Sequence, residues 1–118
     1  MVWNPVRRRA AVRRAFFFAL WAGVRLTWPI LSGLVTLKIC LGIIISMIEG
    51  WSKIDGIYFA FITGLTIGYG DLVPVRGISR VLAVSIGFCG VLLTGVIAAL
   101  VVRALQLAAP VDQLTPRQ

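Results

Sequence analysis

The sequence contains no histidine, only two cysteines and only four acidic residues among its 118 positions. Zinc centres and acid–base catalysis depend on clusters of these residue types, so we expect neither an enzyme nor a bound cofactor. Cys40 and Cys89 both lie in apolar stretches, which indicates buried packing residues and not a disulfide or a metal pair. No convergent nucleophile, base or metal site can be assembled from the residues present, and no soluble substrate is expected.

Charged residues are also scarce, at 14% of the chain, whereas a soluble domain averages about 25%. Hydrophobic residues make up 59%, and the mean hydropathy is +0.96. Residues 81–102 carry no charge and residues 26–48 carry only Lys38, so each segment is long enough to cross a bilayer, which takes about 20 residues. Residues 57–67 are apolar but too short to cross, which predicts a re-entrant helix between two spans. The predicted fold class is an all-α membrane protein.

Positive charge is concentrated before the first span. The arginines there, with no acidic residue among them, are Arg7, Arg8, Arg9, Arg13, Arg14 and Arg25. The segment between the spans is balanced in charge, so the positive-inside rule predicts a multi-pass protein of the cell (inner) membrane with both termini cytoplasmic. The arginines are not accompanied by a sequence motif that binds the groove of a nucleic acid, and nucleic acid is therefore not an expected partner.

Three interpretations of residues 1–25 stay open. The segment is an interfacial helix with its arginines at anionic lipid headgroups, or a twin-arginine export signal at Arg13 and Arg14 that lacks a small-residue cleavage site. The third is a basic anchor that continues into the first span, with Pro29 in the first helical turn. We favour the interfacial anchor, with a lipid bilayer and its anionic lipids as partners. At the other end, prolines discourage a long helix in the short cytoplasmic tail, residues 108–118.

The stretch Thr66-Ile67-Gly68-Tyr69-Gly70-Asp71 is the most informative part of the sequence. Glycine adopts positive φ at little cost, so alternate peptide units can turn and direct successive carbonyls to one side. This stretch resembles the selectivity filter of the potassium channel family, with isoleucine where valine is more usual. Residues 55–63 resemble the pore helix of that family, and Pro74 with the apolar helix after it extends the likeness.

The resemblance implies a two-helix, pore-only channel of the bacterial type, assembled as a homotetramer. Its pore domain is residues 26–107, made of outer helix 26–48, pore helix 55–66, filter 66–71 and inner helix 78–107. The filter positions implied to bind permeating K⁺ through their carbonyls are Thr66, Ile67, Gly68 and Tyr69, followed by Gly70 and, at the outer mouth, Asp71. Asp55 is the expected cap of the pore helix, whose carboxyl end directs a partial negative charge to the membrane centre.

Behind the filter, the sequence departs from the family pattern. The expected support residues are Tyr58, Phe59, Ile62, Thr63 and Leu65. Many relatives have two tryptophans at the first two positions and threonine at the last, and the prototypical bacterial channel has glutamate at the third. Each change removes a polar group, so we predict a filter held more by packing than by hydrogen bonds, with altered inactivation and with Tyr58 as its main clamp.

Two features of the spans carry both a functional and a structural interpretation. Gly90 lies where the family often has a hinge glycine, but glycine there equally serves close helix packing. The face at helical spacing beyond it is the expected lining of the cavity and gate: Val91, Thr94, Ala98 and Val102. Lys38 lies near the bilayer centre, where a lysine costs roughly 2.5–3.5 kcal/mol. It has either a functional role or a long side chain that snorkels to the interface, and we favour the second.

The sequence thus predicts a potassium-selective channel with K⁺ as its permeant ion. One alternative is a weakly selective Na⁺/K⁺ channel, because the short outer loop resembles that of two-helix pores that admit sodium. The filters of those pores lack a tyrosine, so Tyr69 favours potassium. The other alternative is a non-conducting assembly subunit, which is separated by whether purified chains form tetramers and carry current.

Overall fold

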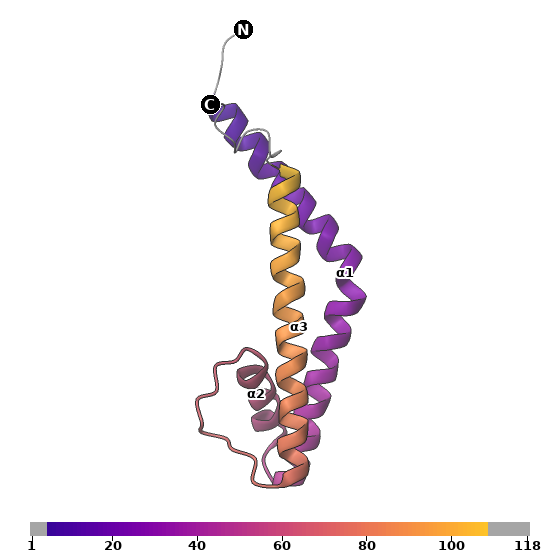
Figure 1. Ribbon diagram of the computed structural model, residues 1–118, viewed down its shortest axis with the longest axis vertical. Coiled ribbons are helices and arrows are strands. Elements are labelled where there is room, and N and C mark those ends of the chain that lie inside the picture. The colour runs from indigo at the N-terminus through magenta and orange to yellow at the C-terminus, as the bar shows by residue number, and fades with distance from the viewer. Residues whose placement is uncertain (1–4, 109–118) are drawn as a thin grey trace, which may run out of the picture. The chain divides into compact units, whose positions relative to one another are not determined.

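The computed structural model describes residues 5–108, which form three helices: α1 (Pro5–Glu49), α2 (Lys53–Gly64) and α3 (Gly77–Ala108) (Figure 1). Both α1 and α3 contain a stretch long and apolar enough to cross a membrane, within Arg9–Glu49 and Gly77–Ala108. The all-helical prediction is therefore confirmed over the described residues. α3 lies within one residue of the expected range 78–107 at each end, and the remainder of the expected tail lies outside the described residues.

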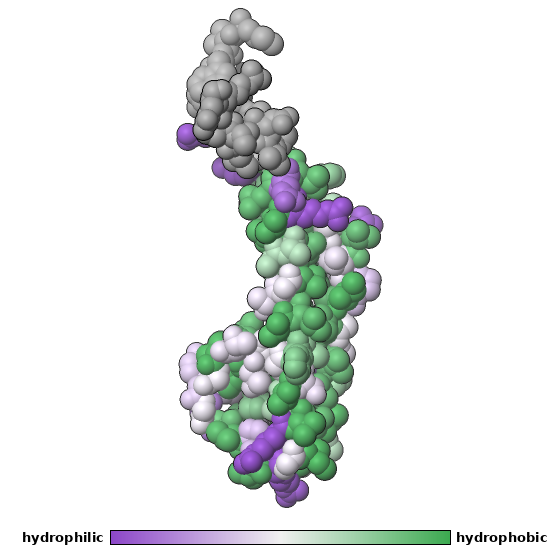
Figure 2. Space-filling view, viewed as in Figure 1, coloured by the Kyte–Doolittle hydropathy of each residue, from purple (hydrophilic) through white to green (hydrophobic). Residues whose placement is uncertain are grey.

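The chain divides into two compact units, and α1 and α3 contribute to both. We call residues 29–96 the central unit and the described residues 5–28 and 97–108 the terminal unit. Large hydrophobic side chains remain exposed along α3 of the central unit, including Val81, Val84 and Phe88. Hydrophobic residues also dominate the face of the molecule seen in Figure 2. Such a surface suits helices that face lipid or another chain.

α1 corrects two expectations about the start of the chain. The helix is continuous from Pro5 to Glu49, so the described part of residues 1–25 is not a separate segment, and Pro29 lies inside the helix, not in its first turn. Proline removes one helical hydrogen bond, but Arg25, Leu26 and Leu31 near it favour helix. Nearby hydroxyls also bond to helix carbonyls, with Thr27 Oγ1 2.9 Å from the Gly23 oxygen. Side chains of this kind allow membrane helices to tolerate proline.

The turn between α1 and α2 is set by two capping arrangements. Gly50, at φ 78°, ends α1, and the Trp51 N–H donates to the Ser46 carbonyl at 2.9 Å, the longer bond of a Schellman motif. α2 then begins at Lys53 with Ser52 as its amino-terminal cap, because the Ser52 hydroxyl accepts from the Asp55 N–H at 3.1 Å. The expected Asp55 cap is therefore wrong. The Asp55 carboxylate instead accepts the Ser52 hydroxyl at 2.7 Å.

The core of the central unit joins all three helices. Its buried members are Ile45 of α1, Phe59 and Ala60 of α2, and Ile86 of α3. Trp51 covers Phe59 edge-on, with ring centroids 5.5 Å apart at 63°. This cluster holds α2 against the two long helices, and so fixes the position of the loop that follows α2.

Two pairs of glycines bring the helix backbones into direct contact. A Cβ atom on Gly42 of α1 would meet the carbonyl oxygen of Gly56 of α2, and a Cβ on Gly56 would meet that of Gly42. In the same way, a Cβ on Gly90 of α3 would meet the carbonyl of Gly64, the last residue of α2. Neither contact leaves room for a side chain. The packing interpretation of Gly90 thus has a concrete partner at the carboxyl end of α2.

Candidate functional site

The loop after α2 has an alternating backbone. Thr66, Gly68 and Gly70 have φ values of 58°, 57° and 79°, whereas Ile67 and Tyr69 between them do not have positive φ. Positive φ is easy for glycine but uncommon for threonine, and it costs of order 1–3 kcal/mol in residues other than glycine. Alternation of this kind turns every second peptide unit, so that successive carbonyls can share one side. The structure therefore has the backbone pattern on which the sequence-based filter hypothesis depends.

The N–H groups of this loop point back to the end of α2. Thr66 donates to the Thr63 carbonyl at 3.0 Å, and Ile67 and Gly68 both donate to the Ile62 carbonyl, at 2.8 and 3.3 Å. These bonds satisfy carbonyls that a helix end otherwise leaves without partners. The N–H groups of Thr66, Ile67 and Gly68 are thus occupied by the end of α2, while the carbonyls of residues 66–69 accept no hydrogen bond within the described residues.

The filter side chains are exposed in the single chain. Tyr69 is 69% exposed and Ile67 48% exposed, and residues 65–71 are all in the exposed class. Tyr69 therefore does not wedge against another part of its own chain. A wedge of the expected kind needs a neighbouring copy.

Tyr58 lies close enough to Asp71 for the two side chains to interact across the loop, and the clamp role of Tyr58 stays a prediction. Hydrogen bonding with Asp71 raises the pKa of Tyr58, and desolvation and the negative charge of Asp71 add to this effect. The other expected support residues are placed differently. Phe59 and Ile62 are buried, with Phe59 packed on Trp51, while Leu65 is 53% exposed. Ile62 supports the loop through its carbonyl, and no sequence pattern could have indicated that role for its backbone.

The expected lining residues of α3 are exposed in the single chain, as an inner surface of an assembly requires. Val91 is 59% and Val102 53% exposed, and Thr94 and Ala98 are also in the exposed class. The Thr94 hydroxyl donates to the Gly90 carbonyl at 3.0 Å, so its proton is held by its own helix. Its oxygen keeps a lone pair for a hydrated ion.

Lys38 does not snorkel, which overturns the interpretation that we favoured. Its side chain is only 2% exposed, and its Nζ lies 4.1 Å from the centroid of the Phe61 ring of α2. The Lys38 Cδ and Nζ atoms are also 3.5 and 3.7 Å from the position that a Cβ on Gly64 would occupy. The lysine side chain therefore lies against Gly64 and Phe61 at the end of α2.

Glu49 is a functional neighbour that the sequence reasoning missed. Its carboxylate accepts the N–H of Val75 at 3.3 Å and that of Arg76 at 3.0 Å, immediately before α3 begins. A carboxylate at this place suits the positive end of a helix. The only available signal was an acidic residue at the last position of the first span, and its partners lie 26 and 27 residues further along the chain.

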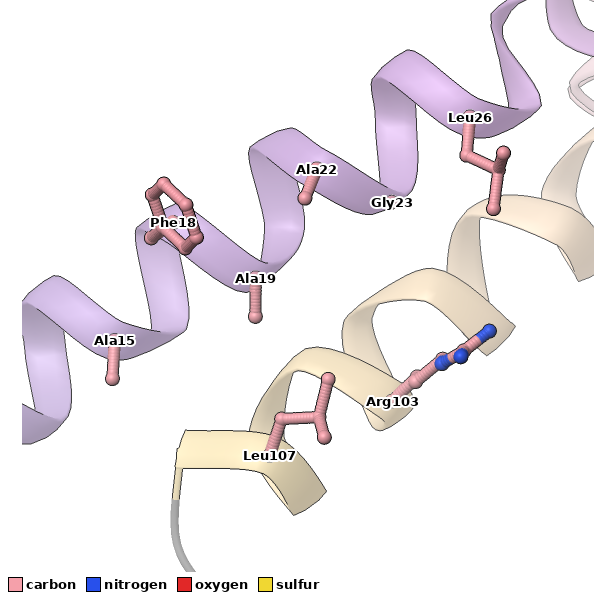
Figure 3. A pocket seen from close by; sticks show the side chains of 8 residues that line it. All are labelled: Ala15, Phe18, Ala19, Ala22, Gly23, Leu26, Arg103 and Leu107. Atoms are coloured by element: carbon pink, nitrogen blue, oxygen red, sulfur yellow. The ribbon is translucent and has the colours of Figure 1, made fainter.

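The terminal unit contains a hollow of about 430 Å³ between α1 and α3. Figure 3 shows small side chains of α1 along one wall, with Arg103 and Leu107 of α3 opposite. Its lining is Ala15, Phe18, Ala19, Ala22, Gly23, Leu26, Arg103 and Leu107. A second hollow nearby in the same unit is lined by Trp21, Val24, Arg25 and Trp28. Each hollow therefore combines an apolar wall with one arginine.

Comparison with known proteins matches residues 33–107 to a protein family described as "Ion channel". Potassium channel subfamily K member 12 of Homo sapiens is 38% identical over 69 residues, which are 57% of this chain and 16% of that protein. Potassium channel subfamily K member 17 of Homo sapiens is 48% identical over 44 residues, 37% of this chain and 13% of that protein.

A plant protein gives a similar match. Two-pore potassium channel 1 of Arabidopsis thaliana is 48% identical over 42 residues, 36% of this chain and 12% of that protein. The chain therefore spans less than a fifth of the length of these relatives. No solved structure matches the chain.

Proposed function

Since this chain belongs to the ion channel family, we propose that it forms a homotetrameric pore that conducts K⁺ passively across a membrane. The observation that carries the proposal is the loop at residues 66–70, where positive φ alternates along the chain and the N–H groups of Thr66, Ile67 and Gly68 are bound back to α2. Four such loops around an axis provide stacked rings of carbonyl oxygens that replace the hydration shell of a cation.

The K⁺ sites of this pore are the carbonyls of Thr66, Ile67, Gly68 and Tyr69. The ion loses water at these rings and needs no catalytic group, so potassium is the permeant species and no resident cofactor takes part. Asp71 concentrates cations at the outer mouth, where Tyr58 holds it in place. On the inner side, the exposed face of α3 from Val91 to Val102 lines the cavity and the gate.

The lipid bilayer is the partner of the long apolar helices. Both termini lie in the cytoplasm. Anionic lipids are the partner of the terminal unit, whose described residues include several arginines and no acidic residue. The two hollows support this part of the proposal, because each combines arginine with an apolar wall (Figure 3). Headgroup phosphates pair with arginine, and acyl chains fit the apolar side.

The test of conduction is K⁺ against Na⁺ uptake into liposomes that hold the purified chain, with Tyr69→Asp as the variant that disables the filter. Selective K⁺ uptake that the variant loses is the expected result. Equal uptake of both ions would replace the proposal by a weakly selective channel. A folded tetramer that carries neither ion, even with the gate residue Val102 changed to serine, would reduce the chain to an assembly subunit.

A further inference from the structure

Lys38 is a buried cation that has no role in conduction through the carbonyl rings. It lies in the last third of α1, and its side chain passes Gly64 and ends over the Phe61 ring in the last turn of α2. An aromatic face attracts an ammonium group, which keeps the charge at that place without a carboxylate.

The place that Lys38 reaches is the negative end of a helix. A helix carries a partial charge of about −0.5 at its carboxyl end, and a cation within the last turn is favoured there. The N–H groups that follow α2 already donate to the carbonyls of Phe61, Ile62 and Thr63. No further backbone N–H group of this segment is therefore left to offset the negative end of the helix. Lys38 supplies the positive charge from a different helix.

We propose that Lys38 is a built-in counter-charge at the carboxyl end of α2, which weakens the attraction of that end for a cation in the inner cavity. The inference rests on the proposed channel function, in which the same helix ends attract the permeant ion from below the filter. The tethered ammonium and the mobile cation then compete for one partial charge. Lys38 is a positioning residue for the electrostatics of the pore and does not touch the ion.

Gly64 supports the same conclusion from the geometry. A side chain at that position would lie in ordinary contact with the Lys38 Cδ and Nζ, 3.5 and 3.7 Å away, and so would line the path of the lysine. On its other side, Gly64 is in backbone contact with Gly90 of α3. The lysine is therefore buried in contact with the last residue of α2, with its charge over the Phe61 ring.

The experiment is block of K⁺ current by tetrabutylammonium applied from the cytoplasmic side, in planar bilayers that hold wild type, Lys38→Met or Lys38→Arg. The methionine keeps the length and apolar stem without the charge, and the arginine keeps the charge. A charge at a helix end changes affinity by about two- to fivefold. We expect Lys38→Met to tighten block by at least twofold and Lys38→Arg to stay within twofold of wild type. Arg80→Gln, an exposed charge at the start of α3, is the matched control and leaves block unchanged.

The result that overturns the inference is equal block in wild type and Lys38→Met when both assemble and conduct. Lys38→Gln is the second neutral variant, and loss of the tetramer in both neutral variants with Lys38→Arg intact would assign the lysine to assembly alone, against the inference. Failure of the proposed function is a separate outcome, because wild type itself would then carry no K⁺. A merely structural role lowers the melting temperature of Lys38→Met without any change in block.

Discussion

The glycines at the helix contacts and the glycines of the loop after α2 are required for different reasons. Gly42, Gly56 and Gly90 lie where a Cβ would collide with a backbone carbonyl. Gly68 and Gly70 have nothing within 4 Å of a Cβ, but their φ values of 57° and 79° exclude most other residues. At the helix contacts, the residue must have no side chain. In the loop after α2, the residue must adopt positive φ. The same substitution, glycine to alanine, therefore separates what holds the chain together from what the proposed ion path requires.

The largest effect is expected for Gly90→Ala in the contact region. The new Cβ collides with the Gly64 carbonyl, so helices α2 and α3 must separate, and such overpacking costs about 1–3 kcal/mol or more. Thermal unfolding of the purified assembly in detergent measures this loss. Gly87→Ala on the same helix has open space and is the control, with unchanged or slightly raised stability. Unchanged stability of Gly90→Ala together with altered open probability would instead favour the hinge.

Gly68→Ala is expected to reduce ion flux, whereas Gly90→Ala is expected to reduce stability. The new methyl group meets no atom, but alanine is disfavoured at φ 57°, by roughly 1–2 kcal/mol, and the carbonyls at this position are expected to turn away. We expect K⁺ flux to fall at least tenfold in liposomes while the tetramer still forms. Gly33→Ala, in open space on α1 and without positive φ, keeps full flux. Loss of the tetramer in Gly68→Ala would mean that the loop also holds the assembly.

Glu49→Gln tests the contact that ties α1 to the start of α3. The amide keeps an acceptor for the N–H groups of Val75 and Arg76 but loses the charge that favours the helix end. We expect a small fall in melting temperature and unchanged ion selectivity. Lys53→Gln, an exposed charge in the first turn of α2, is the comparison. Equal melting temperatures for the two variants would remove Glu49 from the set of stabilising residues.

Tyr58→Phe is expected to have the smallest effect, and that effect depends on pH. The folded-state pKa of Tyr58 is raised, mainly through hydrogen bonding with Asp71, so its neutral form stabilises the fold. This contribution is fully present below the unfolded pKa of about 10, and it disappears as pH rises through the folded value. Wild type should therefore melt slightly above Tyr58→Phe at pH 7, with a difference that shrinks above pH 10. A difference that grows with pH would contradict this assignment.

Much of the helix layout could be predicted from the sequence, because length and charge decide which segments can cross a bilayer. The long apolar runs became parts of α1 and α3, and the run too short to cross became most of α2 and the start of the loop after it, since α2 ends at Gly64 and not at the expected residue 66. The continuity of α1 through Pro29 could not be predicted, since it depends on neighbouring helix propensity outweighing one lost hydrogen bond. The cap of α2 was ambiguous for a similar reason, as Ser52 and Asp55 are both good capping residues.

The candidate site was predictable only as a motif. The glycines of the filter indicated positive φ at two positions, but Thr66 at φ 58° follows from the loop as a whole and not from its own preference. The position of Lys38 against Gly64 and Phe61 could not be predicted either, since both partners are distant in sequence and meet it only once the helices pack. Contacts between residues far apart in the chain have no local signal, and these are the contacts that place the site.

The bond from Glu49 to Val75 and Arg76 joins the two ends of the segment that contains α2 and the filter loop. Both ends of that segment meet where α1 ends and α3 begins (Figure 1). Because the entry and exit of the segment are pinned together, residues 65–71 can vary without displacement of either long helix, whereas α2 is fixed by the contacts of Gly56 and Gly64. We therefore expect substitutions in residues 65–71 to leave the packing of the three helices intact.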